Sequence, residues 1–121
     1  MKIDRFEDAE VWRLARSFAS KVYLLTLKGK LADDYSFRDQ LRRTAVSIMA
    51  NIAEGFERKS NKELSRFLFI AKGSAGELRS HLYLARDINY IDKKVFDEFM
   101  KEVLIISKSL SGFIKYLKTH K

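Results

Sequence analysis

The sequence contains no cysteine and no proline, and only five glycines and two histidines among its 121 residues. The absence of cysteine excludes disulfides and thiolate metal sites. The absence of proline and the scarcity of glycine remove the residues that most often interrupt a helix. No apolar run approaches the roughly 20 residues that a membrane-spanning helix requires, and the charged residues 1–5 do not resemble the start of a signal peptide. We therefore expect a cytoplasmic protein that does not contact a membrane.

Apolar residues make up 46% of the chain and recur with helical spacing throughout. In the first segment, for example, Val11, Ala15, Phe18 and Val22 alternate spacings of four and three residues. Gly29 is expected to end this helix, and Ser36, Ser60 and Asp92 are candidate N-caps of later ones. The sequence predicts a single all-α domain over residues 1–121, an antiparallel up-down-up-down four-helix bundle, with helices at about 8–27, 36–57, 61–89 and 93–118.

Residues 44–53 of the second predicted helix are apolar or small on nearly all sides. A helix with this pattern is normally buried on all sides. In so small a bundle the second buried side most simply belongs to an interface with another copy of the chain. The alternative is a helix packed tightly within a monomer.

The sequence offers little material for catalysis. Glu77 and His81 share one helix face, but one carboxylate and one imidazole make at most half of a metal site. Gly73–Gly76 superficially resembles a phosphate-binding loop, yet it lacks the Gly-Lys-Ser/Thr continuation and falls within a helix. We expect no enzymatic activity, no catalytic residue, no metal and no cofactor.

The net charge is +8, from 24 basic and 16 acidic side chains, which favours an anionic partner, nucleic acid first. The end of the last helix should lie beside the turn between the second and third helices. The residues expected to converge there, and to contact RNA or DNA phosphates with low sequence specificity, are Arg58, Lys59, Lys62, Arg66, Lys115, Lys118 and Lys121. Two simpler explanations are complementarity to the helix dipoles and a basic protein without a polyanionic partner.

Two segments carry a family resemblance: Gln40–Gly55, which ends in Asn-Ile-Ala-Glu-Gly, and Phe67–Leu78, which contains Ile-Ala-Lys-Gly-Ser-Ala-Gly-Glu-Leu. Together they resemble the four-helix-bundle proteins encoded by 23S rRNA intervening sequences. Met49 stands where members often have proline. The resemblance implies a bacterial up-down bundle that forms ring-shaped homopentamers and whose role is largely undefined. A related branch, the accessory variability protein of diversity-generating retroelements, is a basic pentamer that binds nucleic acid and the reverse transcriptase.

The motif residues are expected to be structural rather than to contact a ligand. A hairpin that turns near residues 59 and 60 places Arg42 level with Glu77, which predicts an interhelical Arg–carboxylate pair. Polar groups on so apolar a helix should be hydrogen-bonded, and small residues should allow close helix packing. The set comprises Arg42, Arg43, Asn51, Glu54, Gly55, Gly73, Ser74 and Glu77. Two other functions remain open: a scaffold that docks a partner protein such as a polymerase, and an insertion-encoded protein with no host role.

Overall fold

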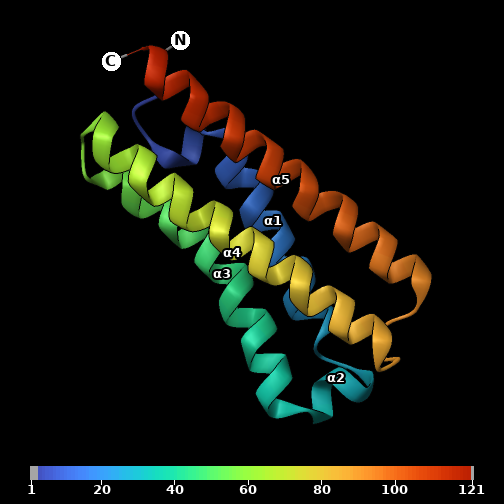
Figure 1. The fold of residues 1–121 in the computed structure, drawn as a ribbon. Coiled ribbons are helices and arrows are strands. Elements are labelled where there is room, and N and C mark those ends of the chain that lie inside the picture. Colours follow the sequence, from blue (N-terminus) through green and yellow to red (C-terminus); the bar gives the residue numbers. More distant parts are fainter. Residues whose placement is uncertain (1–2, 121) are drawn as a thin grey trace.

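The computed structural model describes residues 3–120, and over that range the chain is helical with no strand (Figure 1). The predicted all-α fold class is confirmed. A 3-10 turn precedes five α-helices, four of which are long. The elements are η1 (Phe6–Asp8), α1 (Glu10–Leu25), α2 (Gly29–Asp33), α3 (Tyr35–Glu57), α4 (Asn61–Asp87) and α5 (Lys93–Thr119).

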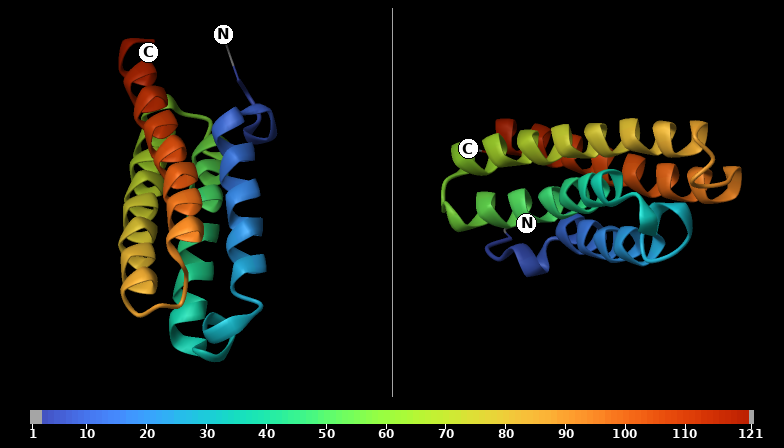
Figure 2. Two further views of the ribbon diagram at one scale, coloured as in Figure 1. Left: turned by 90° about the vertical axis from the view of Figure 1, so that its right-hand side faces the viewer. Right: turned by 90° about the horizontal axis from the view of Figure 1, so that it is seen from below.

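The four long helices pack side by side, with α3 against α1 and α4, and with α5 against α4 and α1 (Figure 2). Helices α3 and α4 form a tight hairpin. Ser47, in the middle of α3, reaches Ser74 with 2.9 Å between the two hydroxyl oxygens. Gly55, near the end of α3, lies against Leu64 in the first turn of α4. The two helices therefore run past each other in opposite directions.

The core is made of the apolar stripes that the sequence spacing indicates. Ile48, Leu78 and Leu110 are completely buried, and the rings of Phe18 and Phe99 pack with their centroids 5.8 Å apart. Truncating a fully buried leucine or isoleucine to alanine costs about 2–5 kcal/mol. Between residues 3 and 120, no helix is both long enough and apolar enough to cross a lipid bilayer.

The connection between α1 and α3 differs from the expectation that Gly29 ends the first helix, since α1 ends at Leu25. Gly29 has a φ of 68°, a left-handed conformation that glycine adopts without strain, and it begins the short helix α2. Leu31 of α2 is 2% exposed, so burial of this side chain anchors a helix too short to be stable alone. One apolar residue among charged neighbours gives no periodic signal, which is why the sequence did not reveal α2.

The helix starts were predicted correctly in two of three cases. The side chains of Ser60 and Asp92 accept hydrogen bonds from the backbone amides three residues later, as expected of N-caps. The prediction for Ser36 was wrong, because α3 begins one residue earlier and Asp34 accepts the capping hydrogen bond from the Phe37 amide at 3.1 Å. The predicted boundaries 8–27, 61–89 and 93–118 are off by one or two residues at the frayed ends.

Candidate nucleic-acid interface

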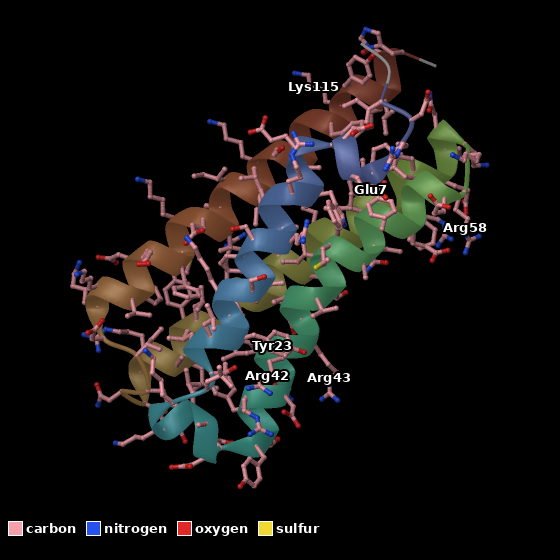
Figure 3. The ribbon with its side chains drawn as sticks, turned by 180° about the vertical axis from the view of Figure 1, so that it is seen from behind. Glu7, Tyr23, Arg42, Arg43, Arg58 and Lys115 are labelled. Carbon is pink, nitrogen blue, oxygen red and sulfur yellow. The ribbon has the colours of Figure 1, made fainter. Side chains whose placement is uncertain are left out.

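The structure brings the predicted basic residues to one end of the molecule. The side-chain amide of Asn61, at the start of α4, donates a 3.3 Å hydrogen bond to the carbonyl of His120 at the end of α5. Figure 3 shows Arg58 and Lys115 at this same end. We call the cluster of exposed cations there the basic end, and it consists of Arg58, Lys59, Lys62, Arg66, Lys115 and Lys118. Lys121, the seventh predicted member, lies outside the described residues.

The two arginines of the basic end are bound to acids of the same chain. Arg66 contacts both carboxylate oxygens of Glu63 at 3.2 Å. Arg58 lies 3.0 Å from Glu54 and 3.6 Å from Glu63. The hydrogen bond from Arg66 lowers the pKa of Glu63, which keeps that carboxylate charged. Both guanidinium groups also lie over the ring of Phe67, at 5.0 and 4.5 Å from its centroid, so their orientation is fixed.

The four lysines of the basic end are in a different state. Among the described residues, none of Lys59, Lys62, Lys115 and Lys118 has an acidic partner within ion-pair distance. A flexible, exposed ammonium group of this kind can approach phosphate oxygens without first breaking an internal ion pair. These lysines are therefore the cations most available to a polyanion.

Acids from the start of the chain dilute the positive charge here, as the sequence indicates. Asp4 and Glu10 line the same groove as Lys59, a hollow of about 940 Å³ between the N-terminal segment, the α3–α4 turn and the end of α5. Glu7 lies nearby (Figure 3). A hydrogen bond with its own backbone amide, assisted by Arg5, lowers the pKa of Glu7 and keeps it negative. The groove itself is thus of mixed charge, and the lysines outside it carry the positive surface.

The predicted pair between Arg42 and Glu77 is wrong. Arg42 turns to the opposite side of α3, where its Nε donates to Thr26 Oγ1 at 2.8 Å and its guanidinium lies 4.8 Å from the centroid of the Tyr23 ring. The reason is geometric: consecutive residues of a helix point about 100° apart. Arg42 consequently faces α1, whereas Arg43 faces outward (Figure 3).

Arg43 and Glu77 do share a small polar hollow of about 380 Å³ between α3 and α4, lined also by Gln40 and Ser47. Within the described residues no ion pair joins them. Glu77 instead lies 3.9 Å from His81, whose ring packs edge-on against Phe37 at 6.0 Å between centroids. In residues 3–120 no three His, Cys, Asp or Glu side chains cluster in a way that could hold a metal ion.

Among the remaining polar motif residues, Ser74 takes part in a hydrogen bond between α3 and α4, and Asn51 supports its partner on α3. The Asn51 amide donates to the Ser47 carbonyl at 2.8 Å and to its hydroxyl at 3.0 Å, and that hydroxyl contacts Ser74. Asn51 and Ser74 therefore have the structural role expected of them, with Ser47 as a link that the sequence did not single out. Glu54 does not cross to α4, since its partner is Arg58 on the same helix.

The two glycines of the motif differ in their surroundings. A Cβ atom added to Gly55 would lie 3.0 Å from Leu64 Cδ1 and Phe67 Cβ, so glycine is required for the close approach of α3 and α4. A Cβ added to Gly73 would meet nothing within 4 Å. The expectation that Gly73 allows close packing is thus wrong within a single chain, because this residue lies on the open side of α4.

The open side of the α3–α4 hairpin is partly apolar. On α3, residues 44–53 have one fully buried side, while Val46 and Ala50 stay exposed. On α4, Phe69 is 52% exposed and Ile70 is 41% exposed. We call this surface the outer hairpin face, and it comprises Val46, Ala50, Phe69, Ile70 and Gly73. It is the side of α3 that the sequence pattern suggested another copy would cover.

Comparison with known proteins identifies the family. Residues 7–112 match the family described as 23S rRNA-intervening sequence protein. The chain belongs to this family. A crystal structure of a protein with unknown function from the S23 ribosomal protein family of Bacteroides thetaiotaomicron VPI-5482 is similar to the chain, with a TM-score of 0.80 and 25% identity, over 87% of this chain and 95% of that one. No curated protein matches the chain.

Membership of the 23S rRNA-intervening sequence protein family accounts for both sequence motifs, which lie on α3 and α4 inside the matched range. The match also includes the α3–α4 turn with Lys59 and Lys62. It ends at residue 112, before Lys115 and Lys118, so these two lysines must be assessed from their surroundings alone. The relation to the accessory variability protein of diversity-generating retroelements stays a prediction.

Proposed function

We propose that this 23S rRNA-intervening sequence protein is a non-enzymatic, antiparallel four-helix bundle that self-associates and binds nucleic acid through backbone phosphates at its basic end. The observation that carries the proposal is the gathering of four lysines where α5 ends beside the α3–α4 turn, none of which has an acidic partner within residues 3–120. In an oligomer the same cluster is repeated in each copy, and linked weak contacts bind a long polyanion more tightly than one copy does.

The up-down-up-down topology is supported by contacts between the remaining helix pairs. Arg42, early in α3, contacts Thr26 at the end of α1. Tyr83, late in α4, packs against Phe96 at the start of α5, with ring centroids 5.2 Å apart. Each contact joins the end of one helix to the beginning of the next, as alternating directions require.

Self-association is supported by the outer hairpin face. An exposed patch that combines Phe69 and Ile70 with the small residues Ala50 and Gly73 would allow another helix to approach closely and bury apolar surface. Static light scattering tests this proposal. We expect a homo-oligomer, with a pentamer as the predicted size, and we expect Ala50→Glu to dissociate it while Ser17→Glu, an exposed position on α1, leaves it intact. A monomer at tens of micromolar would contradict the proposal.

Nucleic-acid binding is tested by fluorescence anisotropy with labelled RNA and DNA between 50 and 200 mM salt. Four phosphate contacts per copy give a slope of log affinity against log salt of about −3.6 for a duplex. The double variant Lys59→Gln/Lys62→Gln should make the slope about 1.8 less negative. The matched control is Lys28→Gln/Lys30→Gln, two exposed lysines in the α1–α3 connection at the other end of the molecule. No salt-dependent binding by the unmodified protein would refute this function.

A second candidate function is docking of a partner protein such as a reverse transcriptase. The observation in its favour is an exposed apolar site at the end of α1, where Leu24 and Leu27 are each 64% exposed. Sedimentation of the mixed proteins distinguishes it, because Leu24→Ser/Leu27→Ser would abolish co-sedimentation and the lysine variants would not. If neither ligand binds, self-assembly remains as the only activity, as expected of an insertion-encoded protein without a host role.

A further inference from the structure

The outer side of α5 carries a straight row of lysines that extends beyond the basic end. Lys94, Lys101, Lys108 and Lys115 follow one another at intervals of seven residues, and all four are exposed. Seven residues are close to two full turns, so each lysine is rotated by only about 20° from the previous one. At a rise of 1.5 Å per residue, the lysines are spaced by about 10.5 Å along the helix and the row is about 31 Å long.

Of the three acids of α5, Glu98 is exposed one turn from both Lys94 and Lys101, while the other two pair with lysines outside the row. Asp97 lies 2.7 Å from the ammonium group of Lys93, and Glu102 lies 2.9 Å from Lys21 on α1. No aspartate or glutamate follows Glu102 in the sequence. Among the described residues, none of the four lysines of the row has an acidic partner within ion-pair distance.

The fold leaves the row open. Val103, Ile106 and Leu110 face the core and are at most 1% exposed, so the lysines project from the opposite side of α5. Helix α5 packs mainly against α4 and α1 and meets α3 across the core, where the ring centroids of Phe56 and Phe113 lie 5.9 Å apart, which puts it diagonally across from the helix that carries Val46 and Ala50. Another copy of the chain could therefore cover the outer hairpin face without covering the lysine row on α5. Lys115 belongs both to the lysine row and to the basic end (Figure 3), so the row continues the positive surface of the basic end.

We propose that a double-stranded nucleic acid lies along α5 and contacts this lysine row through its phosphates over about nine base pairs. This inference rests on the proposed function and specifies its ligand and its extent. A duplex advances about 3.4 Å per base pair, so the row matches about nine, and a duplex stays straight over that length because its persistence length is about 150 base pairs.

The surroundings of the row favour a duplex over the other polyanions. Binding of single strands typically uses exposed aromatic rings on which bases stack, and the aromatic residues of α5 between Lys94 and Lys115 are all buried or half-buried. Tyr116, just after the row, is 38% exposed, but its ring stacks on His120 with 3.9 Å between centroids. A helix that lies in a membrane interface needs a wide apolar face. The apolar side of α5 is already in the core, and Leu104, Ile105 and Tyr116 are the large apolar residues exposed in the described part of this helix.

The experiment compares three matched double variants of the full chain: Lys101→Gln/Lys108→Gln in the row, Lys59→Gln/Lys62→Gln at the turn, and Lys28→Gln/Lys30→Gln as the control. Each is titrated with duplexes of 6, 9, 12 and 20 base pairs at 50 and 200 mM salt, after circular dichroism has shown an unchanged fold. Affinity per copy should rise up to about nine base pairs. Raising the salt from 50 to 200 mM should weaken binding of both proteins. The fold-loss of affinity should be about tenfold smaller for the row variant than for the unmodified protein, because two phosphate contacts are missing.

Four results would overturn the inference. The first is a row variant that keeps the full salt dependence while the turn variant loses it, which would leave the proposed function intact at the basic end alone. The second is tighter binding to single strands than to duplexes of equal length. The third is that the unmodified protein binds vesicles containing 30% anionic lipid but does not bind nucleic acid, with vesicle binding lost in the row variant and kept in the control variant. Absence of binding to any duplex would overturn the inference, and absence of binding to single strands as well would remove the proposed function with it.

Discussion

The two ends of this helical protein both carry cations, but they use them differently. At the end formed by the α1–α3 connection, Arg42 donates to the fully buried Thr26 and lies over Tyr23, and Arg38 lies 4.7 Å from the centroid of the Tyr35 ring while it contacts Asp39. At the basic end, four lysines have no such partners within the described residues, a state that Lys28 and Lys30 share at the α1–α3 end.

The comparison shows why the number of basic residues alone does not locate a binding site. A guanidinium that is stacked on a ring and hydrogen-bonded to its own chain stabilises the fold, and a ligand must displace those contacts before it can use the charge. An exposed ammonium group without such contacts gives up only bound water when it contacts a phosphate. Substitutions of the bound arginines at the α1–α3 end should therefore affect stability, whereas substitutions of the lysines at the basic end should affect binding and its salt dependence.

The largest effect is expected from Gly55→Val, which alters the framework of the basic end. The new side chain would overlap Leu64 and Phe67 and, through Phe67, would disturb both arginines that lie on its ring. Overpacking together with the displacement of a helix pair should cost about 2–4 kcal/mol. Urea unfolding followed by circular dichroism measures the loss.

The control for this prediction is Gly112→Ala on α5. Nothing lies within 4 Å of the Cβ position there, so the higher helix propensity of alanine should raise the free energy of unfolding by about 0.5–1 kcal/mol. Equal destabilisation by both substitutions would mean that Gly55 is not specifically required for close packing.

A smaller effect is expected at the other end from Arg42→Met, which keeps most of the apolar length but removes the guanidinium. Thr26 Oγ1 would lose its donor in a fully buried position, at a cost of about 1–2 kcal/mol in the free energy of unfolding. The salt dependence of nucleic-acid binding should not change. If it became clearly weaker, Arg42 would contact the ligand and the distinction between the two ends would fail.

The sequence predicted the regular parts of the molecule well, because their determinants are local. Apolar spacing located the four long helices, and Ser60 and Asp92 marked two helix starts correctly. Helix α2 escaped detection because it is held by one buried side chain, Leu31, and by a left-handed Gly29. Neither leaves a repeating pattern in the sequence.

The candidate site was predictable only in outline. The expected reversal of direction between successive helices was enough to predict that the end of α5 lies beside the α3–α4 turn, where Asn61 contacts His120. It was not enough to decide which cations are paired, since pairing depends on rotation of each helix about its axis. Counting residues from the hairpin turn therefore matched Arg42 with Glu77, although the Arg42 side chain points to Thr26 at the end of α1. It also gave no indication that Glu63 binds two arginines.

The pairing of Glu63 provides a test at the basic end. Glu63→Gln should remove the ion pair of Arg66 and one of the two ion pairs of Arg58, which keeps its contact with Glu54. Affinity for nucleic acid should rise about two- to fivefold, and the salt slope should become about 0.9 more negative for each further phosphate that an arginine binds. Glu57→Gln, an exposed acid in the same turn that has no described ion-pair partner, controls for the general loss of negative charge. An equal rise in both variants would show that Arg58 and Arg66 remain bound.

The smallest effect is expected from a tyrosine at the α1–α3 end. The hydroxyl of Tyr90 donates to Asp34 Oδ2 at 2.8 Å, and this hydrogen bond, followed by burial and by repulsion from the Asp34 charge, raises the pKa of Tyr90. The folded state then holds the phenolic proton more tightly than the unfolded state. Its contribution to stability is complete below about pH 10, the ordinary pKa of tyrosine, and is lost as the pH rises through the folded-state value.

Urea unfolding of the unmodified protein and of Tyr90→Phe at pH 8, 9, 10 and 11 measures this contribution. The difference in stability between the two proteins should shrink as the pH rises. Deprotonation of the lysines occurs in the same range, but it affects both proteins alike and cancels in the difference. Because Asp34 also caps α3, the cap stays in place in Tyr90→Phe and only the link to the α4–α5 connection is removed. A constant difference across this range would mean that the hydroxyl makes no such bond in solution, and that the α1–α3 end is held by its arginines alone.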